Sequence, residues 1–208
     1  MKTLTKSELN IAQNICERWE SIGMFDYDYM MDFEETYDDI QYFNGCTKMC
    51  FITEELPGWV FKVTFNNIKF DYCKREADNY ADAEAEGLGQ YFASTYRVYE
   101  CTDGRVVVVQ EELDVNEEAV SDSLYRYAYD TLDPADFETD QEISDSAWDI
   151  MYSFDDYERI DALFGGEKYI AELQDFIQEH RINDLHEANW GWSQTSGLVM
   201  MDFSGYGF

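Results

Sequence analysis

The sequence predicts an α+β fold, with an antiparallel sheet in the first half of the chain and mainly helices in the second. Three observations support this prediction. Short runs of β-branched and aromatic residues, separated by turn residues, lie between residues 40 and 113. Segments with helical spacing of apolar residues flank and follow these runs. The composition is globular, because 17% of the 208 residues are aromatic despite a net charge of −31.

The first predicted helix spans residues 4–22. Its apolar residues recur every three or four positions, as they do along one face of a helix. The residues of this face are Leu9, Ala12, Ile15, Cys16 and Trp19. An acidic and aromatic segment, residues 24–40, follows, and its pattern leaves the secondary structure open.

Five strands and one helix are expected between residues 40 and 113. The runs IQYF, KMCFI and WVFKVTF are separated by turns at Asn44-Gly45 and Leu56-Pro57-Gly58. A helix over residues 71–88 follows. The runs TYRVYEC and RVVVVQEEL come next, joined by a turn at Asp103-Gly104. The expected order is therefore three strands, one helix and two strands.

The second half of the chain is predicted to be mainly helical and strongly acidic. Residues 111–161 hold 18 acidic residues against two basic ones, and their helices are expected to break near Asp133-Pro134. A clearer helix is expected from Glu167 to about His180. The chain closes with a predicted hairpin: the strand NWGW, a turn through Ser193–Gly197 and the strand LVMMDF.

Charge and composition exclude several classes of function. The acidity disfavours direct binding to nucleic acid or to an anionic membrane, because both would be repelled. It permits a basic protein partner or mimicry of nucleic acid, and solubility alone is the simpler alternative. The five cysteines contain no CxxC pair, which favours reduced thiols in a cytoplasmic protein. We expect no signal peptide and no membrane span, since no apolar run approaches ~20 residues.

The closing hairpin gathers residues suited to metal chemistry. With a turn at Ser193–Gly197, Asn189 lies across the ladder from about Met201 and therefore close to Asp202. Asp184 lies just upstream, in the loop that follows a helix. Two carboxylates and a carboxamide are suitable ligands for Mg²⁺, with one acid left to act as a base.

These residues resemble the protein-kinase-like superfamily. The sequence DLHEAN at residues 184–189 is similar to its catalytic loop, in the variant found in aminoglycoside-phosphotransferase-like members. The sequence DFSG at residues 202–205 is similar to its DFG element. Alone, each residue could be an ordinary turn or surface residue, but their order and spacing favour the resemblance.

The resemblance covers residues 40–114 and 168–208 and implies a two-lobed fold. An antiparallel N-lobe sheet would occupy residues 40–114, preceded by a helix and an acidic-aromatic extension at residues 1–39. A reduced, mainly helical C-lobe carrying the catalytic loop and metal hairpin would occupy residues 115–208.

The resemblance also implies roles for individual residues. Asp184 would orient or deprotonate the acceptor hydroxyl, and Asn189 with Asp202 would hold Mg²⁺. Lys62 would grip the α- and β-phosphates of ATP. Glu76 lies on the mostly apolar face of the following helix and would hold Lys62, because a carboxylate on an inner face needs a partner.

The remaining nucleotide contacts implied by the resemblance come from two segments. The first is the phosphate loop NGCTK, through Gly45, Thr47 and Lys48. The second is the segment whose backbone would meet adenine, formed by Gln110, Glu111, Glu112 and Leu113. The sequence departs from the family in having one glycine in the phosphate loop and in ending six residues after Asp202, so the activation segment is expected to be absent.

Two functions are compatible with this sequence. The first is an ATP- and Mg²⁺-dependent kinase-like phosphotransferase acting on a protein. The second is a non-catalytic acidic inhibitor or interaction protein on a kinase-like scaffold, which mimics nucleic acid as an anti-restriction or anti-CRISPR protein does. The catalytic residues favour the first function, and the acidity of residues 111–161 favours the second.

Overall fold

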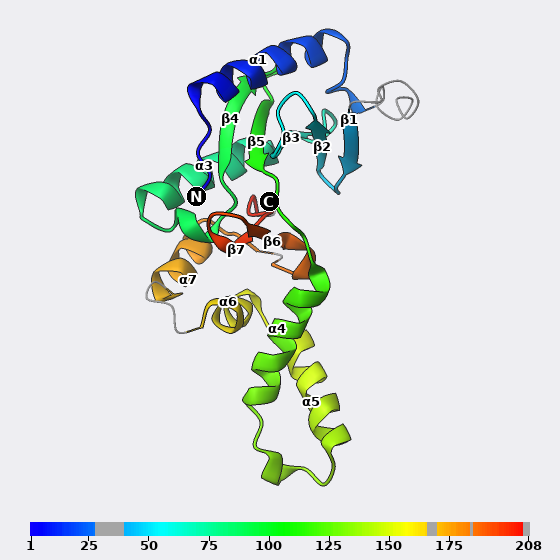
Figure 1. Ribbon diagram of the computed structural model, residues 1–208, viewed down its shortest axis with the longest axis vertical. Helices are drawn as coiled ribbons and strands as arrows, with labels where there is room; N and C mark the ends of the chain where they lie inside the picture. The colour runs from blue at the N-terminus through cyan, green and yellow to red at the C-terminus, as the bar shows by residue number, and fades with distance from the viewer. Residues whose placement is uncertain (28–39, 166–169, 184, 206–208) are drawn as a thin grey trace.

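The computed structural model describes residues 1–27, 40–165, 170–183 and 185–205 (Figure 1). The predicted α+β class is confirmed, because an antiparallel sheet in the first half is followed by mainly helical structure in the second. None of the helices in these ranges is long and apolar enough to cross a membrane.

The sheet has five antiparallel strands in the order β1-β2-β3-β5-β4. Helix α3 (Tyr72–Ala85) connects β3 to β4, so the predicted order of three strands, one helix and two strands is confirmed. The strands are β1 (Ile40–Asn44), β2 (Lys48–Thr53), β3 (Trp59–Thr64), β4 (Thr95–Glu100) and β5 (Val106–Glu111).

Helices cover both faces of this sheet. Helix α1 (Lys6–Ser21) packs its buried Trp19 against Phe51 and Phe61, with ring centroids 5.4 and 4.9 Å apart. Helix α3 packs on the opposite face, against Val106 and Val108. Because side chains alternate along a strand, Lys62 points to the α3 face while its neighbour Phe61 points to α1.

The helical half follows β5. A predicted break near Asp133-Pro134 is present, and a second, unpredicted break occurs at Phe154, because Asp155 and Glu158 form a capping box that starts a new helix. The elements are α4 (Glu117–Asp130), η2 (Pro134–Asp136), α5 (Asp140–Ser153), α6 (Asp156–Phe164) and α7 (Ile170–Glu179).

The closing hairpin packs beneath the sheet, on a hydrophobic core that is separate from the one between α1 and the sheet. This hairpin consists of β6 (Trp190–Ser193) and β7 (Gly197–Met200), preceded by the short turn η3 (Glu187–Asn189). Its buried residues join those of α3, α7 and η1 (Gly89–Tyr91) in one cluster. The predicted register is confirmed, since the Met201 N–H donates to the Asn189 carbonyl at 2.8 Å.

Candidate functional site

A pocket of about 540 Å³ lies between the α3 face of the sheet and the closing hairpin. Its floor is formed by side chains from alternate strand positions, which share one face of the sheet. These residues are Cys50 and Ile52 of β2, Val60 and Lys62 of β3, and Gln110 of β5. The volume falls within the range of roughly 300–1,000 Å³ that is typical of small-molecule sites.

Lys62 and Glu76 meet at the inner end of this pocket. Lys62 Nζ lies 3.1 Å from Glu76 Oε1, and the two side chains are 8% and 0% exposed. Glu76 reaches this position because it shares the sheet-facing side of α3 with Cys73 and Tyr80. The structure therefore brings together the two residues that the sequence predicted to form a pair.

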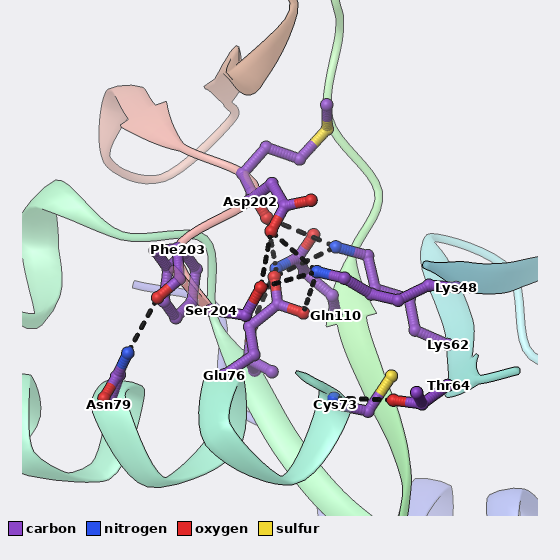
Figure 2. A network of polar contacts seen from close by, with 12 residues as sticks. Lys48, Lys62, Thr64, Cys73, Glu76, Asn79, Gln110, Asp202, Phe203 and Ser204 are labelled. Carbon is purple, nitrogen blue, oxygen red and sulfur yellow. Dashed lines mark hydrogen bonds and ion pairs between the residues drawn. The ribbon is translucent and has the colours of Figure 1, made fainter. Parts of the chain in front are cut away.

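Glu76 has more partners than the sequence predicted. Lys48 Nζ donates to Glu76 Oε2 at 3.2 Å, and Gln110 Nε2 donates to Glu76 Oε1 at 3.2 Å, as Figure 2 shows. Two ammonium groups and an amide thus surround one carboxylate. A charge buried this deeply is tolerated only where its lone pairs are satisfied, so Glu76 is the organising residue of the site.

Lys48 occupies a different place from the one expected in a phosphate loop. It is the first residue of β2, and its Nζ lies 2.6 Å from Asp202 Oδ1 and 3.2 Å from Ser204 Oγ. The strand alternation explains this, because Lys48 shares a face with Cys50, which pairs with Lys62 across β2 and β3. Burial acts to lower the pKa of Lys48, but the neighbouring carboxylates of Glu76 and Asp202 outweigh it and raise the pKa.

Asp202 lies at the opening of the buried network, with its side chain 40% exposed. Burial acts to raise the pKa of this carboxyl, but the ammonium groups of Lys48 and Lys62 and the hydrogen bonds from Lys48 and Ser204 hold it well below its usual range. The carboxylate is therefore ionised at neutral pH. Oδ1 takes both hydrogen bonds, and Oδ2 accepts none from the residues that the structure describes.

The backbone around Asp202 is fixed from several sides. The Met201 carbonyl accepts hydrogen bonds from Lys62 Nζ at 3.2 Å and from Gln110 Nε2 at 2.9 Å. The Phe203 carbonyl accepts one from Asn79 of α3 at 2.7 Å. The buried Phe203 ring packs edge-on against the Phe92 ring, with centroids 5.1 Å apart. These contacts hold Asp202 in place without using its second carboxylate oxygen.

Gly205 brings the end of this segment against the chain that leads to the predicted catalytic loop. Its φ is +68°, and a Cβ there would collide with the Arg181 carbonyl, so only glycine fits. Asn183, His186 and Asn189 follow Arg181 and line the pocket. Asp184, the predicted base, lies outside the described residues.

The segment predicted to meet adenine forms the outer edge of the pocket. The N–H groups of Glu112 and Asp114 donate to Gly58 and Trp192, at 3.0 and 3.2 Å. The N–H of Leu113, between them, donates to no residue that the structure describes, and Leu113 lines the pocket. This edge therefore holds one backbone donor without a partner among the described residues.

Two other residues of this segment use their side chains in ways that the sequence did not predict. Gln110 belongs to the strand ladder and turns its amide inward, onto Met201 and Glu76. Glu111 is buried, and its carboxylate accepts hydrogen bonds from the Ser94 N–H and from Ser193 Oγ, both at 2.8 Å. Glu111 thus ties the sheet to the closing hairpin.

Gly45 and Thr47 line the pocket at the turn between β1 and β2. The sequence missed Ser204, which hydrogen-bonds both Lys48 and Asp202, although its place two residues after Asp202 was a usable signal. Within the described part of the chain, no group of three or more His, Cys, Asp or Glu residues is arranged to hold a metal ion.

Comparisons with known proteins give a distant structural likeness. No family model matches the sequence, and no curated protein matches it. One similar solved structure is a GDP complex of a point mutant of aminoglycoside 2'-phosphotransferase-IIIa, with 12% identity, a TM-score of 0.36 and coverage of 84% of this chain and 69% of that one. Another is APH(2")-IIia with GDP and kanamycin, with 13% identity, a TM-score of 0.37 and coverage of 90% and 72%. Both TM-scores are below 0.5, so the likeness is distant.

Proposed function

We propose that this pocket binds ATP and that the chain is a kinase-like phosphotransferase. The observation that carries this proposal is the buried contact between Lys62 and Glu76 at the inner end of a pocket of about 540 Å³. An ammonium has three protons, and the described residues accept two from Lys62, through Glu76 and the Met201 carbonyl. The third proton is the proposed contact to a phosphate oxygen.

The adenine ring would lie at the outer edge of the pocket. The open Leu113 N–H supplies a donor to a ring nitrogen, and the side chains of Ile52, Val60 and Met201 supply apolar walls. A purine needs this combination of flat apolar surfaces and a few placed polar groups. Gly45 and Thr47 would approach the phosphates from the β1–β2 turn.

Asn189 and Asp202 fit a Mg²⁺ ion that takes its other ligands from phosphate and water. Both are oxygen donors, which Mg²⁺ prefers, and Asp202 Oδ2 accepts no hydrogen bond within the described residues. A bound ion would neutralise charge on the transferring phosphate. Asp184 remains the proposed base for the acceptor hydroxyl, on its place in the sequence.

Nucleotide binding and transfer can be tested with one matched pair of proteins. ATP should stabilise the wild type, by about 2.7 kcal/mol at a concentration 100 times the Kd, whereas Lys62→Met should lose this stabilisation. Transfer to a protein acceptor should be followed with ATP labelled at the γ-phosphate. The absence of any thermal shift at millimolar ATP, in a wild type that melts cooperatively, would refute the proposal.

A second candidate function is recognition of a basic protein by the hairpin of α4 and α5. Figure 1 shows these two helices extending side by side away from the rest of the chain. Residues 117–153 contain 11 acidic residues and one basic residue. Trp148 and Tyr152 are 37% and 71% exposed and stack with ring centroids 5.8 Å apart. Exposed aromatic rings among carboxylates suit arginine side chains, which combine cation–π contact with charge attraction.

This surface would hold the protein acceptor of the phosphotransferase or the basic partner of an inhibitor. An arginine-rich peptide should bind the wild type and should bind the double variant Trp148→Ala/Tyr152→Ala at least about tenfold more weakly. The matched control is Tyr157→Ala, which removes an exposed ring of α6 outside the hairpin. Equal affinity of all three proteins would exclude the aromatic strip as the contact.

A further inference from the structure

Lys48 has a contact for every proton of its ammonium group. The three acceptors are Asp202 Oδ1 at 2.6 Å, Glu76 Oε2 at 3.2 Å and Ser204 Oγ at 3.2 Å, and all converge on Nζ in Figure 2. The side chain is 5% exposed. Since an ammonium donates three hydrogen bonds, Lys48 has none left for a ligand.

Lys62 differs from Lys48 in this respect, although both contact Glu76. The described acceptors of Lys62 are two, Glu76 Oε1 and the Met201 carbonyl, and Asp202 is not among its hydrogen-bond partners. The two lysines therefore divide the work of the site. Lys62 can donate its remaining N–H to a phosphate, whereas Lys48 is held by Asp202, whose carboxylate faces the pocket.

The charges of the buried network are consequently balanced before any ligand arrives. Two ammonium groups, Lys48 and Lys62, face two carboxylates, Glu76 and Asp202. A lone carboxylate at the position of Asp202 would repel a nucleotide phosphate unless a neighbouring cation offset its charge. Lys48 already supplies that cation as part of the chain.

We infer that Lys48 is the resident cation of this site and makes nucleotide binding independent of divalent metal. The inference rests on the proposed nucleotide site. In this arrangement the remaining Asp202 oxygen would hold Mg²⁺, and the ion would be required for transfer but not for affinity.

The test compares nucleotide affinity in EDTA and in Mg²⁺, using fluorescent mant-ADP and mant-GDP as probes. The Kd of the wild type should differ by less than about threefold between the two buffers. Lys48→Met should bind in EDTA at least about tenfold more weakly than in Mg²⁺, because Asp202 then needs the metal. Lys74→Met removes an exposed lysine of α3 outside the site, so this control should behave as the wild type does. Lys48→Arg keeps the charge, so its affinity should depend less on Mg²⁺ than that of Lys48→Met.

The outcomes separate the two levels of the proposal. A wild type that loses about tenfold or more of its affinity in EDTA overturns the resident-cation inference and leaves the nucleotide site standing. A wild type that binds neither probe in either buffer overturns both. The wild-type comparison decides the inference even where Lys48→Met proves too unstable to purify.

Discussion

Glu76 offers the most direct test of the architecture, because its carboxylate is fully buried and holds two lysines at once. Glu76→Leu would leave Lys62 with only the Met201 carbonyl, while Lys48 would keep Asp202 and Ser204. Removing one member of a buried charge group costs roughly 3–5 kcal/mol, since the surviving charge is left unpaired. We expect a loss of this size in the free energy of unfolding.

Lys62→Met should cost less than Glu76→Leu. Glu76 would still be held by Lys48 at 3.2 Å and by Gln110 at 3.2 Å, so no carboxylate is orphaned. We expect about 1–3 kcal/mol for this change. The double variant should then lose less than the sum of the two single losses, by roughly 0.5–3 kcal/mol, because the second change removes a charge that the first had stranded.

Urea denaturation of the four proteins measures this coupling. The pair of Arg18 and Glu55 is the matched control, since its side chains are 52% and 50% exposed and its coupling should stay below about 1 kcal/mol. Additive losses in the Lys62 and Glu76 cycle, within about 0.5 kcal/mol, would refute the reasoning. The nucleotide site would then lose its anchor.

Three further predictions concern the rim of the pocket and the pH dependence of stability. Leu113→Pro removes the backbone N–H and should weaken mant-ADP binding by about tenfold. Leu113→Ala keeps the N–H and should bind nearly as the wild type does. Equal binding by the two variants would argue against this donor. The exposed Cys46 lines the pocket, so it should react quickly with a thiol reagent and be protected by nucleotide. Cys101 should stay unreactive, because burial raises its pKa to about 12. A Cys46 reaction rate unchanged by nucleotide would place the ligand elsewhere. Burial acts to raise the pKa of Glu20, but hydrogen bonds from Thr102 and Tyr99 outweigh it and lower the pKa. The ionised Glu20 therefore stabilises the fold above its unfolded pKa of about 4.3. This stabilisation is lost as the pH falls through the lower folded pKa. Glu20→Gln should therefore flatten the loss of stability below pH ~5 in acid denaturation, and parallel curves would contradict the assignment.

The local signals in the sequence were sufficient for the sheet, the closing hairpin and the Lys62–Glu76 contact. Turn residues fixed the strand limits, and helical spacing put Glu76 on the inner face of α3. The hairpin turn then determined that Asn189 lies opposite Met201, because antiparallel register follows from the position of the turn. Each of these predictions needs only residues that are close in sequence or joined by one turn.

The position of Lys48 required information that lies farther apart in the chain. The Asn44-Gly45 turn suggested a loop residue, yet the pairing of Cys50 with Lys62 places Lys48 on the buried face of β2. Its partner Asp202 is 154 residues away in the sequence, so no local pattern predicts the contact. The inward orientation of the Gln110 side chain was equally hard to predict. In the run VVVVQ every residue before Gln110 is apolar, so the run does not indicate which of its two faces meets α3.

The net charge of −31 and the neutral network of Lys48, Lys62, Glu76 and Asp202 together predict an unusual salt dependence of nucleotide binding. The four charged groups of this network cancel, so the long-range field that an approaching nucleotide feels is that of the acidic chain, including Glu111 and Glu112 of the pocket lining. The Debye length shrinks from about 30 Å at 0.01 M salt to about 8 Å at 0.15 M, which screens this repulsion. The association rate constant of mant-ADP, measured by stopped flow, should therefore rise with salt, whereas binding of an arginine-rich peptide to the α4–α5 hairpin should weaken. An association rate that falls with salt would mean that the lysines dominate the field at the pocket mouth, and that Lys48 is not neutralised by its two carboxylates.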